Sequence, residues 1–535
     1  MLNHRKNNLH PIPQSSILSP PHRKKDRRAD STRFPIPLYL RCVSVLLLGG
    51  LFLEATVFLP PVQVHEEHPL SLLVQQQKQL SSNLTLHHEH ESPSRASNHN
   101  VTTTQTSDND QFSMQLGNSN NVIRTQYHVV FSTSCTDQQH WESYVLFYHA
   151  YKVGQHGNVT RLLSGCNKKE EEEQRLFHQT HIETLSPNFH VHFTPDFGMV
   201  QHHVHANKRE PYKYMNKPFA MKHWYEHVLR YNQSKPSNTQ YDNDIVFLID
   251  PDMILMKPLT HDFRQDPTVE LIGNPDAEHQ YVHRGHPMAQ QDGYLGGEWM
   301  TLNMQKITLV NRTPALHYKR GDGPTHWNSG PPYIFTVVDG YQLVSRWVDF
   351  APRVHHQLPK LFAEMYGYII ASVHLGLPHT LIKSLVVSTT TTSDREGWSF
   401  VDRIQNRVCP YENGPTVEGI FALHYCKRYM VGKRWFWSKY RLRKDFMDCH
   451  APLLQVPSPD AQDEREAFSP RPVHNYKGNW TQEHQILSEK QAKREAFMVC
   501  ALIAKVNEAV EHLKRTSCGD TGNYSKIYNV HDDPG

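Results

Sequence analysis

The stretch Asp244-Ile-Val-Phe-Leu-Ile-Asp-Pro-Asp252 contains the most hydrophobic strand pattern in the chain. Five consecutive apolar residues bounded by acids are typical of a strand that is buried on both faces of a mainly parallel sheet. Other β-branched and aromatic runs lie at 126–133, 159–163 and 189–193, and segments with helical patterns separate them. This alternation predicts an α/β fold with a mainly parallel central sheet.

Two carboxylates, Asp250 and Asp252, follow this strand one residue apart. Ligands of such sheets bind beyond the carboxyl ends of the strands. Paired carboxylates there can hold a hard divalent cation, which can neutralise a departing diphosphate. The pattern alone is weak, because Asp108-Asn-Asp110 and Asp242-Asn-Asp244 also match it and because a solvated turn is the alternative. The position at the strand end favours a metal site.

Two later segments have the apolar spacing of packed helices. Residues 361–375 predict one such helix, with Glu364 in its first turn. Residues 485–514 predict an amphipathic C-terminal helix that docks on the core or on a partner. Its apolar face is formed by Met498, Leu502, Val506, Val510 and Leu513.

The overall composition limits the class of protein. The chain has 535 residues, 38% of them hydrophobic, which allows one large or two ordinary domains. The 56 Lys and Arg against 53 Asp and Glu give a net charge of +3, too small a basic field for nucleic-acid binding. The 38 His are scattered along the chain, which indicates compositional bias; a His-rich metal buffer with many weak sites is the alternative.

The N-terminal region predicts a membrane anchor. Residues 1–41 carry nine Lys or Arg against two acids, and residues 42–62 are apolar enough to span a bilayer, which takes about 20 residues. The charge reverses over 63–122, a polar segment that predicts a flexible stem. This asymmetry predicts a cytosolic tail and a type II signal anchor. A signal peptide that is cleaved near Ala55 is the alternative, and both place the remainder in the secretory lumen.

The cysteines and glycosylation motifs fit that compartment. Seven cysteines follow Cys42, and an oxidising lumen would pair most of them and leave one over. None of their spacings is of the Cys-x-x-Cys type that structural zinc sites use. Seven Asn-x-Ser/Thr triplets are potential glycosylation sites. They begin at Asn83, Asn100, Asn158, Asn232, Asn311, Asn479 and Asn523.

Six segments between residues 123 and 455 carry a family resemblance. They are Tyr127-His-Val-Val-Phe-Ser-Thr-Ser-Cys135 with Trp141, Asn158-Val-Thr-Arg-Leu-Leu-Ser-Gly-Cys166, Tyr214-Met-Asn-Lys-Pro218, Ile249-Asp-Pro-Asp-Met253, Leu361-Phe-Ala-Glu-Met-Tyr-Gly-Tyr368 and Leu423-His-Tyr-Cys426. Together and in this order, they resemble the hydroxyproline O-arabinosyltransferase and peptidyl serine α-galactosyltransferase group, with the closer likeness to the serine branch.

This resemblance implies a GT-A-like nucleotide-sugar-binding fold over 123–455, with 456–535 as a C-terminal extension. It implies a single-pass type II protein of the Golgi or endoplasmic reticulum membrane, with the catalytic domain in the lumen. The donor would be a UDP-sugar, and the cofactor Mn²⁺ or another divalent cation. The acceptor would be a Ser or hydroxyproline hydroxyl of a secreted, hydroxyproline- or Ser-rich polypeptide, and transfer would proceed with retention of configuration.

The resemblance also assigns roles to residues. Asp250 and Asp252 would bind the metal and the diphosphate, and His424 would be the third metal ligand, although a single His among 38 is more often a surface or core residue. Thr133 and Ser134, beyond the first strand, would contact the base and ribose; hydroxyls that close a turn are the alternative.

Two cations and two acids complete the predicted site. Arg161 and Lys217 lie in matched segments and would contact the diphosphate; an ion pair or a solvated side chain is the alternative. Glu364 or Asp339 would stabilise positive charge on the sugar, whereas Glu364 could instead cap its helix.

A glycine-rich segment is a further candidate. Gln290, Gln291 and Asp292 precede the turn-prone stretch 293–297 and predict a sugar or acceptor loop; a surface turn is equally compatible with these residues.

Two other functions remain open from the sequence. A different sugar or acceptor on the same fold would leave every motif intact. A noncatalytic lumenal protein that binds glycan or polypeptide is the second, and Mn²⁺-dependent UDP binding separates it from an enzyme. The sequence predicts no oligomeric state.

Overall fold

The computed structural model describes residues 125–528, with gaps at 206, 232–240, 294, 319–322, 392–394, 412–416, 444, 469–472, 475–479 and 482–483. These residues belong to one compact unit, Gln115–Gly535. The cytosolic tail, signal anchor and stem that the sequence predicts lie outside the described residues. Within the described ranges, no helix has the length and apolar character that crossing a membrane requires.

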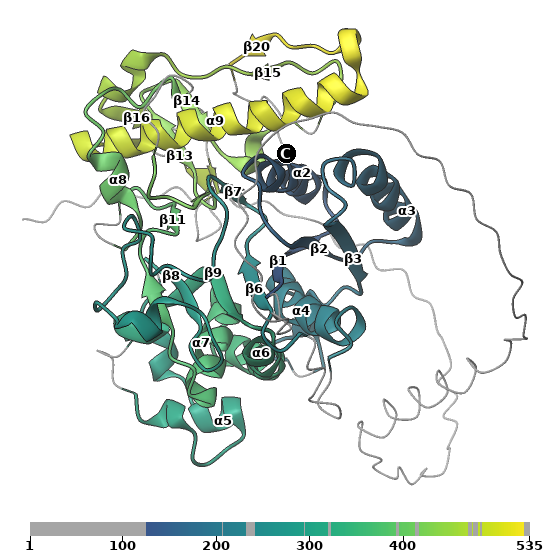
Figure 1. Cartoon of the computed structure of the whole chain (residues 1–535), viewed down its shortest axis with the longest axis vertical. Helices are drawn as coiled ribbons and strands as arrows, with labels where there is room; N and C mark the ends of the chain where they lie inside the picture. The colour runs from purple at the N-terminus through teal and green to yellow at the C-terminus, as the bar shows by residue number, and fades with distance from the viewer. Residues whose placement is uncertain are drawn as a thin grey trace, which may run out of the picture. The chain divides into compact units, whose positions relative to one another are not determined.

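A seven-stranded sheet forms the centre of the unit, in the order β10-β8-β9-β6-β1-β2-β3 (Figure 1). Its strands are β1 (Tyr127–Ser134), β2 (Asn158–Ser164), β3 (Phe189–Thr194), β6 (Ile245–Ile249), β8 (Met288–Gln291), β9 (Ser329–Thr336) and β10 (Thr380–Ile382). In this sheet β9 runs antiparallel to both of its neighbours, and the other pairs are parallel. The predicted α/β fold with a mostly parallel sheet is confirmed.

Strand β6 is buried on both faces, as its five apolar residues predict. Successive side chains of a strand point to opposite faces, and here they enter two different cores. Phe247 and Ile249 pack in the core that contains α2 (Asp137–Lys152) and α9 (Glu489–Ser517). Val246 and Leu248 pack in the core that contains α4 (Asn216–His227), α6 (Val337–Gln357) and α7 (Ala363–Leu375). Helices therefore cover both faces of the sheet.

The remaining helices and strands are short. The helices are α3 (Lys168–Phe177), α5 (Met304–Thr308) and α8 (Trp398–Asp402). A three-stranded sheet has the order β11 (Val386–Val387), β12 (Ala422–His424), β7 (Met253–Leu255). Two-stranded sheets pair β4 (Met199–Gln201) with β5 (Arg209–Pro211), β13 (Tyr429–Val431) with β14 (Trp435–Trp437), β15 (Leu453–Leu454) with β20 (Lys526–Ile527), β16 (Glu466–Phe468) with β19 (His484–Ile486), and β17 (Val473–His474) with β18 (Trp480–Thr481).

The order of the central sheet reverses between β1 and β6. From β1 the chain proceeds to β2 and β3 on one side, whereas β6 pairs with the other side of β1. Helices that connect strands on opposite sides of such a point leave a crevice beyond the carboxyl ends of the two central strands, and ligands of open α/β sheets bind there. We therefore expect a ligand to bind beside the residues that follow β1 and β6.

The C-terminal segment packs on the same unit. Helix α9 begins after Ser488, whose side chain forms a capping box with Gln491. It contacts α2, α8 and β13 (Figure 1), and the apolar residues predicted for its inner face are buried. Residues 456–535 thus include a helix that docks on the core.

Three disulfide bonds are formed, Cys135–Cys166, Cys409–Cys500 and Cys449–Cys518, and Cys426 is the free cysteine of the described residues. This agrees with the prediction that most cysteines pair and one is left over. Two of the bonds attach α9 to the preceding segment, and Cys409–Cys500 closes a separation of 91 residues. A native disulfide of this kind stabilises the fold by about 2–5 kcal/mol.

Candidate active site

The acidic pair lies at the carboxyl end of β6, at the reversal point of the sheet. Strand β7 begins directly after Asp252 and pairs antiparallel with β12, so that His424 is opposite Met253. The backbone N–H of Tyr425 donates to the carbonyl of Asp252 over 3.0 Å. A short second sheet therefore brings His424 to the acidic pair, although more than 170 positions separate them in the sequence.

The three side chains converge on one point. Nε2 of His424 lies 3.3 Å from Oδ1 of Asp252 and 3.7 Å from Oδ2 of Asp250. One ligand atom from each of the three residues lies within 4.8 Å of the others. Burial alone would lower the pKa of His424, but Cys426 and Asp252 outweigh it and hold the pKa well above its ordinary value. The raised pKa favours the imidazolium form, whose positive charge lies beside both carboxylates.

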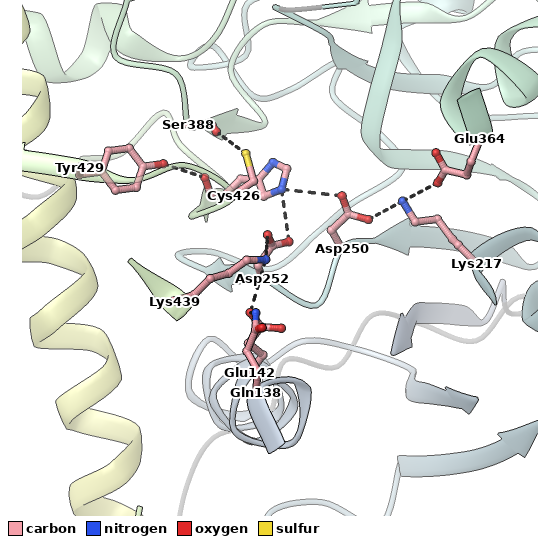
Figure 2. A network of polar contacts seen from close by, with 11 residues as sticks. Gln138, Glu142, Lys217, Asp250, Asp252, Glu364, Ser388, Cys426, Tyr429 and Lys439 are labelled. Carbon is pink, nitrogen blue, oxygen red and sulfur yellow. Dashed lines mark hydrogen bonds and ion pairs between the residues drawn. The ribbon is translucent and has the colours of Figure 1, made fainter. Parts of the chain in front are cut away.

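Two lysines occupy the outer oxygens of the same carboxylates. Nζ of Lys217, on α4, lies 2.7 Å from Oδ1 of Asp250, and Nζ of Lys439, which follows β14, lies 2.7 Å from Oδ2 of Asp252 (Figure 2). The inner oxygens are the ones that face His424. Two carboxylate oxygens and one imidazole nitrogen are a donor set that suits Mn²⁺ or a similar divalent cation. The residues present therefore fit the predicted metal.

Each lysine also binds a second, deeply buried carboxylate. Lys217 lies 3.0 Å from Oε1 of Glu364, on α7, and Lys439 lies 3.5 Å from Oε1 of Glu142, on α2. Burial raises the pKa of Glu364, against the opposing effect of Lys217. Burial also raises the pKa of Glu142 to about 7, because it outweighs the effect of Lys439. Figure 2 shows the chain of contacts from Glu142 through the acidic pair to Glu364.

Of these groups, the sequence prediction includes Asp250, Asp252, His424, Lys217 and Glu364, and the structure brings all five together. It places Lys217 between two carboxylates.

Glu142 and Lys439 were not predicted. Glu142 stands between Trp141 and Ser143 on a helix whose preceding turn is polar, so the sequence offers no sign that its side chain is fully buried. Lys439 lies among several basic residues at 439–444 and has no distinguishing pattern.

Thr133 and Ser134 lie at the carboxyl end of β1, next to the acidic pair, because β1 and β6 are parallel neighbours. Oγ of Ser134 accepts a hydrogen bond of 3.3 Å from Nδ2 of Asn216. Oγ1 of Thr133 accepts one of 2.9 Å from Nε of Arg161. Both hydroxyls are therefore at the predicted edge of the sheet, in contact with protein groups.

Arg161 is fully engaged by neighbouring side chains. Besides Thr133, its guanidinium donates to Oε1 of Gln174 over 3.2 Å and lies 2.8 Å from Nδ1 of His140. Burial lowers the pKa of Arg161 to about 9. The structure thus shows Arg161 cross-linking β1, α2 and α3, and a contact with a diphosphate would require it to leave these partners.

Asp339 lies away from the cluster, contrary to the sequence prediction that placed it beside the sugar. Its backbone N–H and one carboxylate oxygen bond the side chain of Thr336, the N-cap of α6. In the antiparallel pair of β9 and β6, Thr336 is opposite Ile245, the first residue of β6. At about 3.3 Å per residue, the acidic pair lies a strand length of roughly 17 Å away. Asp339 thus takes part in the capping contacts at the N-terminus of α6, whose N-cap is Thr336.

The segment 290–292 does lie at the same edge of the sheet, because β8 and β6 are both antiparallel to β9. The Gln290 side chain binds the backbone of Gln291, Lys383, Val386 and Arg395. Asp292 accepts a hydrogen bond from the backbone N–H of Leu295. These contacts stabilise the loop itself.

The chain is similar to glycosyltransferases. It is 34% identical over 275 residues to the peptidyl serine alpha-galactosyltransferase of Arabidopsis thaliana, a match that covers 49% of this chain and 27% of the relative. The chain thus spans about a quarter of the length of this relative. The resemblance to the serine galactosyltransferase branch is confirmed by this match. No protein-family model matches the chain.

Two solved glycosyltransferase structures match parts of this chain with low identity and low TM-scores. The bifunctional glycosyltransferase WbbM has 12% identity and a TM-score of 0.30, over 58% of this chain and 47% of its own. The galactosyltransferase LgtC, solved with donor and acceptor sugar analogues, has 10% identity and a TM-score of 0.28, over 56% of this chain and 87% of its own.

Proposed function

We propose that this protein is a glycosyltransferase with a GT-A-like fold. It transfers a sugar from a UDP-sugar to a Ser or hydroxyproline hydroxyl of secreted polypeptides, with peptidyl serine galactosylation the best-supported reaction. The observation that carries the proposal is the convergence of Asp250, Asp252 and His424 at the reversal point of the sheet. The similarity to a peptidyl serine alpha-galactosyltransferase supports the choice of sugar and acceptor.

The site fits a reaction in which negative charge grows on a leaving diphosphate. A divalent cation bound by Asp250, Asp252 and His424 would supply electrostatic stabilisation of that charge. Lys217 and Lys439 fix the two carboxylates by binding their outer oxygens, so the inner oxygens stay oriented toward His424. Preorganised carboxylates need little rearrangement on binding, which is how a protein scaffold lowers the cost of charge stabilisation.

Transfer with retention is part of the proposal. The bond between the anomeric carbon and the UDP oxygen breaks to give a short-lived, positively charged sugar. The acceptor oxygen then bonds to the face that UDP leaves, and the hydroxyl proton passes to the departing diphosphate. We assign the stabilisation of that positive charge to Glu364, because Lys217, which lies 3.0 Å from its Oε1, also binds Asp250 and so keeps this carboxylate near the acidic pair. Its side chain is only 3% exposed, which strengthens its electrostatic effect by excluding water.

The proposed location is the lumen of the Golgi or endoplasmic reticulum, with a single-pass type II anchor at residues 42–62. Three disulfide bonds in the described residues support an oxidising compartment. Fractionation and protease protection of the tagged full chain test this location: the C-terminal tag should be protected by intact vesicles, and digestion of that tag outside them would contradict it.

A donor panel tests the activity. The full chain is incubated with individual UDP-sugars, with Mn²⁺ or with a chelator, and with acceptor peptides that contain Ser or hydroxyproline. We expect transfer from UDP-galactose to a Ser peptide in the presence of Mn²⁺ and none with the chelator. Absence of both transfer and Mn²⁺-dependent UDP binding would instead favour a noncatalytic binding protein. Transfer of another sugar would retain the fold assignment and overturn the choice of donor.

A further inference from the structure

A second group of metal-binding side chains lies on the β4–β5 hairpin and the end of α6. It contains His202, His203 and Glu210, whose ligand atoms all lie within 4.8 Å of one another. His355, in the last turn of α6, joins them from the neighbouring element. The group shares no residue with the site at the end of β6, and its interpretation does not depend on the proposed function.

Glu210 is the centre of this group. Its Oε1 lies 3.2 Å from Nδ1 of His203 and 3.8 Å from Nδ1 of His355. Ligand atoms around a tetrahedral zinc ion with bonds of roughly 2.0–2.1 Å are about 3.3 Å apart. The two separations from Oε1 of Glu210 are therefore close to that value.

His355 gives the independent reason to expect a ligand. It is only 5% exposed, and its Nδ1, directed at Glu210, is buried without a hydrogen-bond partner among the described residues. A buried polar atom that lacks a hydrogen-bond partner destabilises the folded protein. A metal ion bound between His355, His203 and Glu210 removes this cost.

His202 has a different role, which its hydrogen bonds define. Its Nδ1 accepts the backbone N–H groups of Val204 and His205, over 3.0 and 3.2 Å. The neutral ring therefore carries its proton on Nε2, which lies 3.8 Å from Oε2 of Glu210. An N–H directed at a ligating carboxylate is a common outer contact that orients metal ligands.

We propose that His203, Glu210 and His355 bind a divalent transition metal, with His202 orienting the carboxylate. Two imidazoles and one carboxylate are ligands that zinc accepts readily, with a fourth position left for water. The metal would attach the β4–β5 hairpin to α6.

This attachment has a consequence for the segment that follows the hairpin. The ring of Tyr212 lies 4.3 Å from that of His355, and its Oη accepts the backbone N–H of Glu364 over 3.1 Å. Tyr212 leads into α4, which carries Lys217. Zinc binding would therefore stabilise the region that supports one side of the β6 site.

Metal content tests the proposal without any assay of turnover. The purified full chain is stripped with a chelator, loaded with Zn²⁺ and desalted, and bound zinc is measured per protein. We expect Glu210→Gln and His355→Ala each to lose one molar equivalent relative to the unmodified protein. The exposed control His156→Ala should keep that equivalent, and both substitutions should also lose it in an Asp252→Asn background, in which the β6 site lacks one of its ligands. Circular dichroism checks that the variants fold, and Glu210, at 22% side-chain exposure, is the safer of the two substitutions.

Three further measurements separate this proposal from its alternatives. Co²⁺ in place of Zn²⁺ should give the visible absorption of a tetrahedral site, and Glu210→Gln should abolish it. Glu278, His283 and His286 form another candidate group, so His286→Ala is measured in parallel. Unchanged zinc content in both Glu210→Gln and His355→Ala, or loss of the equivalent only in His286→Ala, would overturn the proposal. In the Asp252→Asn background, zinc should also raise the melting temperature, and adding Glu210→Gln should abolish that increase.

Discussion

Nζ of Lys439 lies 2.7 Å from Oδ2 of Asp252, although the two residues are 187 positions apart in the chain. Burial by itself would raise the pKa of Asp252, but Lys439, followed by His424, outweighs burial and holds the pKa well below its ordinary range. Asp252 is therefore ionised at neutral pH in a largely buried position. Lys439 makes this possible while leaving the other oxygen of Asp252 directed at His424.

Replacing this lysine should destabilise the fold. Lys439→Met removes the cation shared by Asp252 and Glu142, and breaking a buried ion pair in this way costs about 3–5 kcal/mol. Urea unfolding at pH 7.5 measures the loss. Adding Glu142→Gln should recover part of it, because one of the two uncompensated acids is then neutral.

An exposed lysine provides the matched control. Lys360 lies 3.0 Å from Glu298, and both side chains are about half exposed. Lys360→Met should therefore change the free energy of unfolding by less than about 1 kcal/mol. Equal effects of the two substitutions would contradict the importance of the buried network.

The acidic pair itself is tested by an isosteric substitution. Asp252→Asn keeps the shape of the side chain and removes the charge that a divalent cation requires. We expect Mn²⁺-dependent UDP binding to be lost and sugar transfer to fall by at least about 10²-fold. Isothermal titration of UDP with Mn²⁺, together with the donor assay, measures both effects.

The same sequence offers a control for this substitution. Asp242 belongs to another Asp-x-Asp motif, which precedes β6 and so lies at the opposite end of the strand. Asp242→Asn should retain UDP binding and transfer. Normal transfer by Asp252→Asn would refute the proposed role of the pair.

The sequence predicted the main strands well, because each depends on a local pattern. The five apolar residues before Asp250 make the buried strand recognisable, and its carboxyl end follows from the chain direction. The direction of β9 has no such local signal. Because β9 is antiparallel to β6, the helix that follows it begins at the far edge of the sheet, and Asp339 is carried there. This reversal separates Asp339 from the site.

The residues around the acidic pair also differ in whether the sequence reveals them. His424 was predicted because it lies in a segment with a family resemblance. Glu142 and Lys439 meet only after α2 packs on the sheet and the segment after β14 folds over it. Their proximity is a result of tertiary packing, and neither residue has a periodic or motif signal that a single sequence displays.

Glu364 should affect transfer more than it affects metal binding. It contacts Lys217 at 3.0 Å, and the metal-binding oxygens belong to other residues. We expect Glu364→Gln to lower the rate of transfer by about 10²–10³-fold, the range for loss of one preorganised electrostatic contact. The Mn²⁺ concentration needed for half-maximal UDP binding should change less than about threefold. An equal loss of transfer and of Mn²⁺ affinity would instead make Glu364 a support for Asp250.

Glu396 predicts how stability depends on pH. Its side chain is 4% exposed, and its Oε2 accepts hydrogen bonds from the backbone of Ser388 and Thr389 and from Nε1 of Trp398. Burial nevertheless outweighs these bonds and raises the pKa of Glu396 from 4.5 to about 7. Below pH 4.5 Glu396 is protonated in both the folded and the unfolded chain. Its contribution to the free energy of unfolding is therefore fully present there.

As the pH rises from 4.5 to about 7, the unfolded chain releases this proton first, and the folded state loses stability. The total effect is on the order of 3 kcal/mol. Glu396→Gln removes the titrating proton, so its free energy of unfolding should decline less than that of the unmodified protein over this range. Urea unfolding at pH 4.5, 5.5, 6.5 and 7.5 follows the difference.

Glu172→Gln, at an exposed position on α3, should leave the pH dependence unchanged. Parallel curves for Glu396→Gln and the unmodified protein would show that folding does not raise the pKa of Glu396.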